Sequence, residues 1–230
     1  MARQPTIYIV CSDRHRNGKT LLARVLIDFL LIDGTDPYVI DADVPEGPLR
    51  AVFPGRTALV DLNDIRGQMK LFDTILASPG RDYVIDLPAA GTPVFSAAAV
   101  ELNFTSEARK LGFAIAVLFV IDKDPKSVDA AAGVQSVLQP DLFIPVRNAH
   151  VGSAYRPTLR DLVIDMPALD RELANIIEAR RFSFRAFMLG DEGGVPKTHG
   201  LRLKEFLAAM TTGFQEISPS LSLAKLRAGR

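Results

Sequence analysis

Cysteine, net charge and long apolar runs are all scarce in this sequence. Cys11 is the only cysteine among 230 residues, so no internal disulfide can form, and we expect a cytoplasmic protein in a reducing environment. Lys plus Arg and Asp plus Glu each number 27, and this balance gives no bulk attraction to nucleic acid or membranes. The longest apolar run, residues 112–121, is half the length that a bilayer crossing requires, and the first residues lack the layout of a signal peptide.

Sequence patterns for zinc sites and serine hydrolases are missing as well. The three histidines lie far apart, and no Cys and His spacing typical of a zinc site occurs. Ser12, Ser96 and Ser153 all lack the context of a nucleophile elbow. Hydrophobic residues make up 48% of the chain and charged residues 23%, which is typical of a globular protein.

Alternating apolar runs and helical patterns predict the fold class. Nearly continuous apolar runs predict buried strands at 6–10, 38–43, 83–88, 113–122, 142–146 and 162–167, with 57–62 as a weaker candidate. Helical periodicity covers 20–33, 63–77, 94–110, 126–138, 168–181 and 200–216, whereas 44–56 and 190–198 have loop composition. This alternation predicts an α/β fold, a three-layer, doubly wound, mainly parallel sheet flanked by helices. We expect a single domain over 1–217, with helices 168–217 packed on it and a basic, poorly ordered tail at 218–230.

A loop with phosphate-binding character follows the first predicted strand. The stretch CSDRHRNGKT, residues 11–20, lies between that strand and an amphipathic helix, and it ends in Gly18, Lys19 and Thr20. This is the G-K-[ST] ending of loops that hold a nucleoside triphosphate. Lys19 would neutralise phosphate charge, the Thr20 hydroxyl would bind Mg²⁺, and the first helical N–H groups would add partial positive charge.

Acidic residues stand where two later strands end. Asp41 and Asp43 lie at the end of the second strand run and share one face of an extended chain, because side chains repeat every two residues. Asp86 ends the third run and fits the second acidic element of phosphate-loop enzymes, which holds magnesium through water. Each aspartate alone could cap a loop, but the set beside a G-K-T loop favours a nucleotide site at the carboxyl ends of the strands.

The order of these motifs resembles the ParA/MinD family of deviant Walker P-loop ATPases over roughly residues 5–170. The motifs are RHRNGKT, VIDADVPEG, YVIDLPAAG, VLFVIDKDPKSVDAA and FIPVRNAHVG. The resemblance implies ATP and Mg²⁺ as cofactors and an ATP-dependent homodimer that acts as a switch. It implies catalytic roles for Lys19, Asp43 and Arg14, nucleotide contacts from Arg16, Asn17, Gly18, Lys19, Thr20, Leu21 and Asn148, and metal binding by Thr20, Asp41 and Asp86.

Within this set the resemblance gives Asp43 the orientation of the attacking water and Asn148 the contact with adenine. The loop departs from the family at three positions. Arg14 stands in place of the signature lysine that reaches the partner's phosphates, and His15 and Arg16 replace two glycines. A non-glycine residue in a strained backbone region costs about 1–3 kcal/mol, which charge-assisted phosphate contacts of about 1.5–3 kcal/mol each would offset. We therefore expect a nucleotide site with altered dimer or hydrolysis chemistry, and the alternative is a degenerate site.

The resemblance implies a role in plasmid or chromosome partition, or in positioning a cellular assembly, together with a regulatory or cargo protein. The stretch 178–187 with Arg202 and Lys204 is a candidate basic surface for nonspecific DNA binding, although an ordinary amphipathic helix fits it better. The tail lacks bulky Phe or Trp anchors, so membrane binding is not expected. The alternative functions are a synthetase related to the dethiobiotin and cobyrinate enzymes, for whose substrate pocket this chain has little room, and a non-hydrolysing interaction module.

Overall fold

A parallel β-sheet forms the centre of the computed structural model, which describes residues 3–159, 161–179, 182–191 and 195–228. Within these residues seven strands pair in the order β3-β2-β4-β1-β5-β6-β7, every pair parallel. The strands are β1 (Thr6–Cys11), β2 (Tyr38–Asp41), β3 (Thr57–Leu59), β4 (Tyr83–Asp86), β5 (Ala114–Val120), β6 (Leu142–Asn148) and β7 (Ile164–Met166). The predicted doubly wound fold is confirmed.

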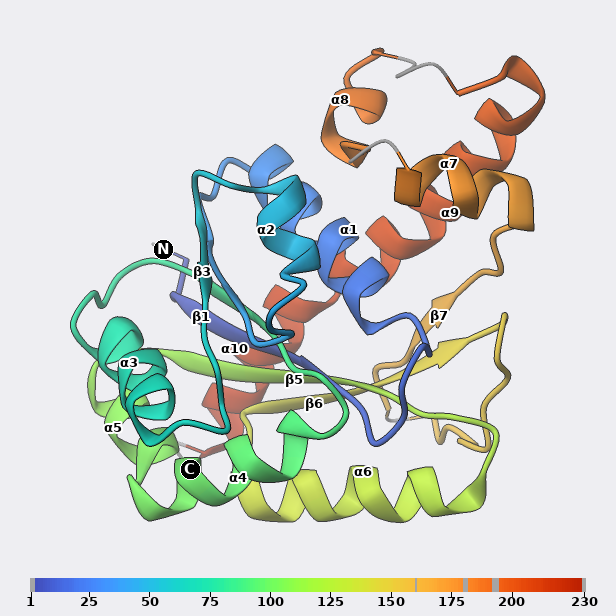
Figure 1. Cartoon of the computed structure of the whole chain (residues 1–230). Coiled ribbons are helices and arrows are strands. Elements are labelled where there is room, and N and C mark those ends of the chain that lie inside the picture. The colour runs from blue at the N-terminus through green and yellow to red at the C-terminus, as the bar shows by residue number, and fades with distance from the viewer. Residues whose placement is uncertain (1–2, 160, 180–181, 192–194, 229–230) are drawn as a thin grey trace.

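Helices cover both faces of this sheet, which explains why its central strands are apolar on both sides (Figure 1). The helices are α1 (Lys19–Ile32), α2 (Pro48–Val52), α3 (Ile65–Leu76), α4 (Gly91–Glu101), α5 (Phe104–Lys110), α6 (Pro125–Leu138), α7 (Arg171–Ala179), α8 (Phe184–Met188), α9 (Lys197–Gln215) and α10 (Ile217–Ala228). Alternate β1 side chains enter separate cores. Tyr8 and Val10 pack with residues of α1 and α7–α10, whereas Ile7 and Ile9 pack with residues of α3–α6.

The structure differs from the sequence expectation in four local places. The helix expected at 94–110 is divided into α4 and α5 by Asn103, whose φ of 50° is left-handed and incompatible with a continuous helix. The short helices α2 and α8 fall in stretches that we expected to be loop or the end of a longer helix. The fourth difference is the tail, whose residues 218–228 form α10 together with Ile217, with Leu221 buried.

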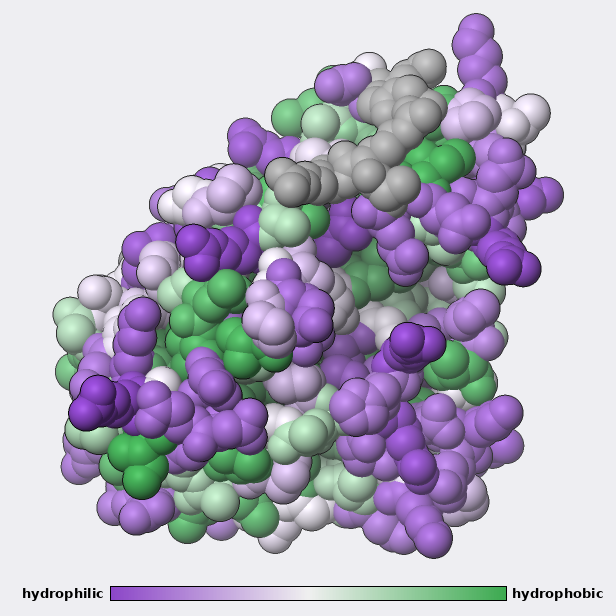
Figure 2. Space-filling model, in the orientation of Figure 1, coloured by the Kyte–Doolittle hydropathy of each residue, from purple (hydrophilic) through white to green (hydrophobic). Residues whose placement is uncertain are grey.

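Burial of two side chains explains why α10 forms an ordered helix. Ile217 is 2% exposed and Leu221 7% exposed, and both belong to the core that also contains α1 and α9 residues. The surface facing the viewer in Figure 2 is mostly hydrophilic, with apolar patches separated by polar side chains. Among the described helices, none has both the length and the hydropathy that a membrane crossing requires.

Candidate functional site

The loop between β1 and α1 is fastened to the end of β5 by two buried polar side chains. The Asn17 amide nitrogen donates to Ser12 Oγ at 2.5 Å and to the Val120 carbonyl oxygen at 3.3 Å. The Ser12 hydroxyl itself donates to the same Val120 carbonyl at 2.7 Å. The loop therefore keeps one shape at the carboxyl edge of the sheet, where ligands bind in open α/β folds.

Gly18 brings the loop into close contact with the ends of β6 and β7. Its φ is 95°, and a Cβ at this position would lie 2.7 Å from both Asn148 Nδ2 and Met166 Cε. The Asn148 amide donates to the Asn17 carbonyl oxygen at 2.9 Å and accepts from the His150 backbone N–H at 2.9 Å. In this arrangement Asn148 supports the β1–α1 loop, and its contact with adenine stays a prediction.

The N-terminus of α1 is open to an anion. Gly18 supplies no capping side chain, and the first turn of α1 contains no acidic residue. In contrast, Asp64 caps α3 and Asp124 caps α6, each by accepting a backbone N–H of its helix. Uncapped helical N–H groups carry partial positive charge and form a ready site for phosphate oxygens.

The side chain of Lys19, the first residue of α1, folds back into the loop that precedes the helix. Its ammonium group donates to the Arg14 carbonyl oxygen at 2.5 Å and to Asn17 Oδ1 at 3.2 Å, and the residue is 7% exposed. Burial lowers the pKa of Lys19, and the neighbouring carboxylate of Asp86 opposes this shift. The ammonium thus has two neutral partners, which a phosphate group could replace.

Thr20 and Asp86 form the polar contact beneath the loop. The Thr20 hydroxyl donates to Asp86 Oδ2 at 2.7 Å. The second oxygen, Oδ1, is buried and has no hydrogen-bond partner in the described part of the chain. Burial raises the pKa of Asp86 to about 7, with the Thr20 hydrogen bond acting in the opposite direction. A buried carboxylate oxygen without a protein partner is costly, so Asp86 Oδ1 is a candidate contact for a ligand or water.

These oxygens fit magnesium. The described residues contain no group of three or more His, Cys, Asp or Glu side chains arranged around a metal ion. Magnesium is commonly held by only one or two protein oxygens, with phosphate oxygens and water completing its octahedron. Thr20 Oγ1 and the unpaired Asp86 Oδ1 are oxygen donors of that kind and would hold a magnesium ion, Asp86 through a bridging water.

Asp41 lies beside Asp86 in the register of β2 and β4, but its carboxylate already accepts hydrogen bonds from the backbone. It accepts the backbone N–H groups of Asp43 at 3.1 Å, Leu49 at 2.8 Å and Arg50 at 3.3 Å. These bonds shape the turn into α2, so a direct bond to a metal would have to replace them. The carboxylate of Asp43 is half-buried, makes no hydrogen bond within the described residues, and acts electrostatically on Lys19.

The two arginines of the loop are placed differently. Arg14 Nη2 lies 2.5 Å from Asp124 Oδ2, and its Nε lies 3.1 Å from Asp13 Oδ2, so the guanidinium faces acidic groups of its own chain. Arg16 is exposed and has a φ of 54°. The strain that we expected from the missing glycines therefore falls on Arg16, while His15 is not among the residues with positive φ.

The sequence did not reveal how the loop is held against α6. Asp13 Oδ1 accepts the Ser127 hydroxyl at 2.5 Å, and Asp124 joins Arg14 to the first turn of α6. An Asp followed by Pro is a typical helix start, so the cap at Asp124 was predictable from D-P, but its contact with Arg14 was not. Leu21, the last predicted nucleotide contact, is half-buried in the first turn of α1.

The candidate basic surface only partly forms. Phe182, Phe184 and Phe187 are buried, so they are unavailable for stacking on bases, in agreement with the amphipathic interpretation. Arg202 pairs with Asp170 at 3.1 Å, whereas Lys204 is exposed. Residues 180–181 of this stretch lie outside the described residues.

No protein-family model matches the chain, and no curated protein matches it significantly. Several solved structures, in contrast, match the chain in fold. MinD from Aquifex aeolicus matches with a TM-score of 0.57 and 14% identity, covering 92% of this chain and 97% of MinD. A putative plasmid partition protein from Borrelia burgdorferi, bound to AMPPNP, matches with a TM-score of 0.54 and 13% identity, covering 93% and 99%. A nucleotide-binding protein from Archaeoglobus fulgidus in complex with ADP gives a TM-score of 0.51 and 15% identity, covering 78% and 88%.

At these identities the similarity establishes the fold. The chain has a ParA/MinD-like P-loop fold, with a seven-stranded parallel sheet in its described part and helices on both faces. The loop of residues 12–18 lies between β1 and α1, at the carboxyl edge of that sheet. Activity has to be argued from the site itself, because one fold hosts many functions.

Proposed function

We propose that this protein binds Mg-ATP at the β1–α1 loop and acts as an ATP-hydrolysing dimeric switch of the ParA/MinD type. The observation that carries the proposal is the buried Asp86 carboxylate. One of its oxygens accepts from Thr20, and the other has no partner within the described residues, at the open N-terminus of α1. The ADP and AMPPNP bound by two proteins of similar fold support a nucleotide as the ligand.

The roles of the loop residues follow from their positions. Lys19 would exchange the Arg14 carbonyl oxygen for phosphate oxygens, and the first N–H groups of α1 would bind the same group. The Asp43 carboxylate, which has no hydrogen-bond partner among the described residues, would orient the attacking water. Magnesium, held by Thr20 and through water by Asp86, would supply charge neutralisation at the β- and γ-phosphates.

Arg14 is the residue that we assign to the dimer interface. Its side chain is 40% exposed, and its present partners, Asp13 and Asp124, belong to the same chain. To reach phosphates bound by a second copy, the guanidinium would have to leave Asp124. The cost is modest, since half-exposed ion pairs contribute little to stability. Arginine suits the role because its planar fork matches phosphate oxygens.

The cellular role that we propose is partition of DNA or positioning of an assembly, read out by a regulatory or cargo protein. The MinD and plasmid partition structures of similar fold support this class of role. A second candidate, a non-hydrolysing interaction module, is favoured by the strained φ of Arg16 and by the Arg14–Asp124 pair.

Calorimetric titration with Mg-ATP tests the first step. We expect Lys19→Ala to weaken binding by roughly ten- to a hundredfold, because a charge-assisted hydrogen bond to phosphate contributes about 1.5–3 kcal/mol. Lys70→Ala removes an exposed lysine from α3 and serves as the matched control, with unchanged affinity. Equal affinities of the original protein and Lys19→Ala would contradict the proposal.

Light scattering after size exclusion tests the switch. We expect Asp43→Ala to bind Mg-ATP and accumulate as a dimer, because the loss of water orientation slows hydrolysis. Asp73→Ala, which removes an exposed carboxylate from α3, should behave as the unaltered protein. Nucleotide binding without dimerisation or turnover would favour the interaction module instead.

A further inference from the structure

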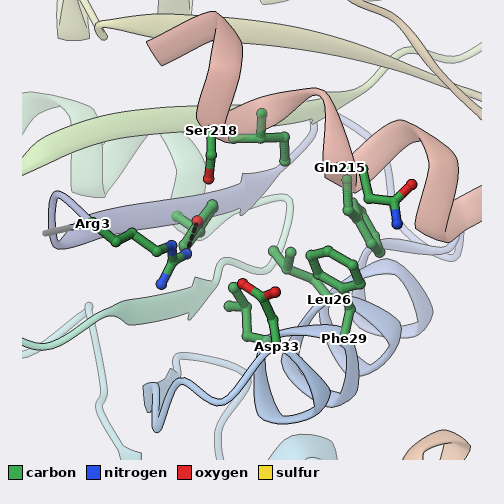
Figure 3. A pocket seen from close by; sticks show the side chains of 10 residues that line it. Arg3, Leu26, Phe29, Asp33, Gln215 and Ser218 are labelled. Carbon is green, nitrogen blue, oxygen red and sulfur yellow. Dashed lines mark hydrogen bonds between the residues drawn. The ribbon is translucent and has the colours of Figure 1, made fainter. Parts of the chain in front are cut away.

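A cavity lies at the C-terminal end of α1, near the amino edge of the sheet (Figure 3). Its volume is about 160 Å³. The start of β1, the last turns of α1 and the junction between α9 and α10 surround it. The phosphate loop follows Cys11 at the carboxyl end of β1, so the two sites occupy opposite ends of the same strand and the same helix.

The wall of the cavity is largely apolar. Leu26, Leu30 and Phe214 are at most 2% exposed, and the rings of Phe29 and Phe214 lie 5.5 Å apart in a tilted arrangement. An apolar cavity of about 150 Å³ is large enough to bind benzene. The space therefore suits a ligand of about six to eight non-hydrogen atoms with an apolar body.

The polar groups at the cavity favour positive charge. Figure 3 shows the Asp33 carboxylate between Arg3 and Phe29, with Ser218 on the far side. Within the described residues the Asp33 carboxylate accepts no hydrogen bond and forms no ion pair, and the Ser218 hydroxyl likewise has no partner. Asp33 is the C-cap of α1, whose last turn has no basic residue, so the negative end of the helix dipole adds to its charge.

Arg3 does not neutralise this site. Its guanidinium donates to the Asp82 carboxylate and, at 2.8 Å, to the Tyr8 hydroxyl. Arg3 interacts with Asp33 only electrostatically. Arg3, Asp33 and Asp82 therefore bring together one cation and two carboxylates. Arg3 is paired with Asp82, so Asp33 is the carboxylate at the cavity without an ion-pair partner among the described residues.

We propose that this cavity binds a small organic cation, an ammonium or amidinium group on a short apolar body. The cationic group lies against the Asp33 carboxylate, which accepts its N–H groups. The apolar body occupies the space beside Phe29 and Phe214, whose rings supply an apolar contact surface. This site is independent of the proposed nucleotide site, since it shares no lining residue with the phosphate loop.

Three probes of one shape and different charge test the proposal on the full chain. Benzylammonium should raise the melting temperature in a concentration-dependent way and should bind in calorimetry without nucleotide. Benzyl alcohol, which is neutral, should bind at least about tenfold more weakly, and benzoate should not bind. Equal binding of benzylammonium and benzyl alcohol would reduce the site to an apolar cavity, and binding of benzoate would assign the site to Arg3. Either result would overturn the proposal.

Variants locate the binding. Asp33→Asn should weaken benzylammonium binding at least about tenfold, whereas Asp73→Asn, in the last turn of α3, should leave it unchanged. Ser218→Leu fills the cavity without changing charge and should also prevent binding while the melting temperature is maintained. Unchanged affinity in both Asp33→Asn and Ser218→Leu would show that the amine binds elsewhere and would refute the assignment.

Discussion

Helices α1 and α6 begin at the same edge of the sheet, after the neighbouring strands β1 and β5, yet their first turns are built differently. Asp124 closes the start of α6 by accepting the Lys126 N–H at 3.0 Å. The start of α1 has Gly18 in place of a capping side chain, and its first turn has no acidic residue. An aspartate carboxylate of the chain thus caps α6, whereas the N-terminal N–H groups of α1 have no side-chain cap from the described residues, which is the arrangement that our proposed nucleotide site requires.

The buried faces of the two helices differ as well. The residues of α6 that are buried are Ser127, Ala131 and Leu138, none of them charged. Helix α1 buries Asp28, whose carboxylate accepts the Phe184 N–H at 2.8 Å. Helix α1, which we propose to serve a site at its N-terminus, is thus also held to α8 through its core-facing side.

The largest effect is expected from adding one methyl group at the start of α1. Gly18→Ala forces an L-residue to a φ of 95° and places its Cβ 2.7 Å from Asn148 and Met166. We expect it to abolish nucleotide binding and to lower the free energy of unfolding by about 1–3 kcal/mol. Gly133→Ala in α6 has nothing within 4 Å of the added carbon, and it should stabilise by about 0.4–1 kcal/mol. Calorimetry with Mg-ATP and urea unfolding of both variants check this. Equal changes in the free energy of unfolding for Gly18→Ala and Gly133→Ala would contradict the expected difference between the two helices.

The pH dependence of stability should reveal the contribution of Asp28, the buried carboxylate of α1. Burial raises the pKa of Asp28 to about 6, so the folded state holds this proton over a pH range in which the unfolded chain has lost it. The contribution of Asp28 to stability is therefore highest below about pH 4, falls as the pH rises to about 6, and stays low above it. Two units of pKa correspond to about 2–3 kcal/mol.

Asp28→Asn keeps an acceptor for the Phe184 N–H and removes the titrating group. We expect the variant to be more stable than the original protein at pH 7.5 and to lose this advantage near pH 4, as measured by urea unfolding. Asp129→Asn, at an exposed position of α6, is the control and should change neither value by more than about 0.5 kcal/mol. Parallel pH profiles for the original protein and Asp28→Asn would show that the carboxylate is ionised throughout.

A smaller effect is expected at the cap of α6. Asp124→Asn retains an accepting oxygen for the Lys126 N–H and removes the charge that holds Arg14, so stability should change by less than about 0.5 kcal/mol. Asp124→Ala also removes the cap and should cost about 0.5–2 kcal/mol. If Arg14 serves the dimer, Asp124→Asn should increase the dimer fraction at fixed Mg-ATP several-fold. A decreased fraction would mean that Asp124 places Arg14 correctly for the dimer.

Much of the fold was predictable because long apolar runs and helical periodicity report burial directly. The main strands and the three-layer arrangement are confirmed, as is the location of the G-K-T loop between β1 and α1. The division of α4 from α5 was missed because nothing in the sequence near Asn103 demands a left-handed φ. Helix α10 was missed because its residues are mostly small or polar. Ile217 and Leu221 stabilise it only through burial in the core that contains residues of α1 and α9.

The sequence alone determined which groups reach the carboxyl edge of the sheet, because each of Lys19, Thr20, Asp41 and Asp86 stands at the end of a strand or the start of a helix. Only the tertiary structure decided how those groups are used. Asp41 bonds three backbone N–H groups, Asp86 keeps one oxygen without a partner among the described residues, and Arg14 turns toward Asp124, 110 positions along the chain. The physical reason is that a side chain's type fixes what it can bind, whereas its partners depend on which segments the packed core brings within hydrogen-bond distance.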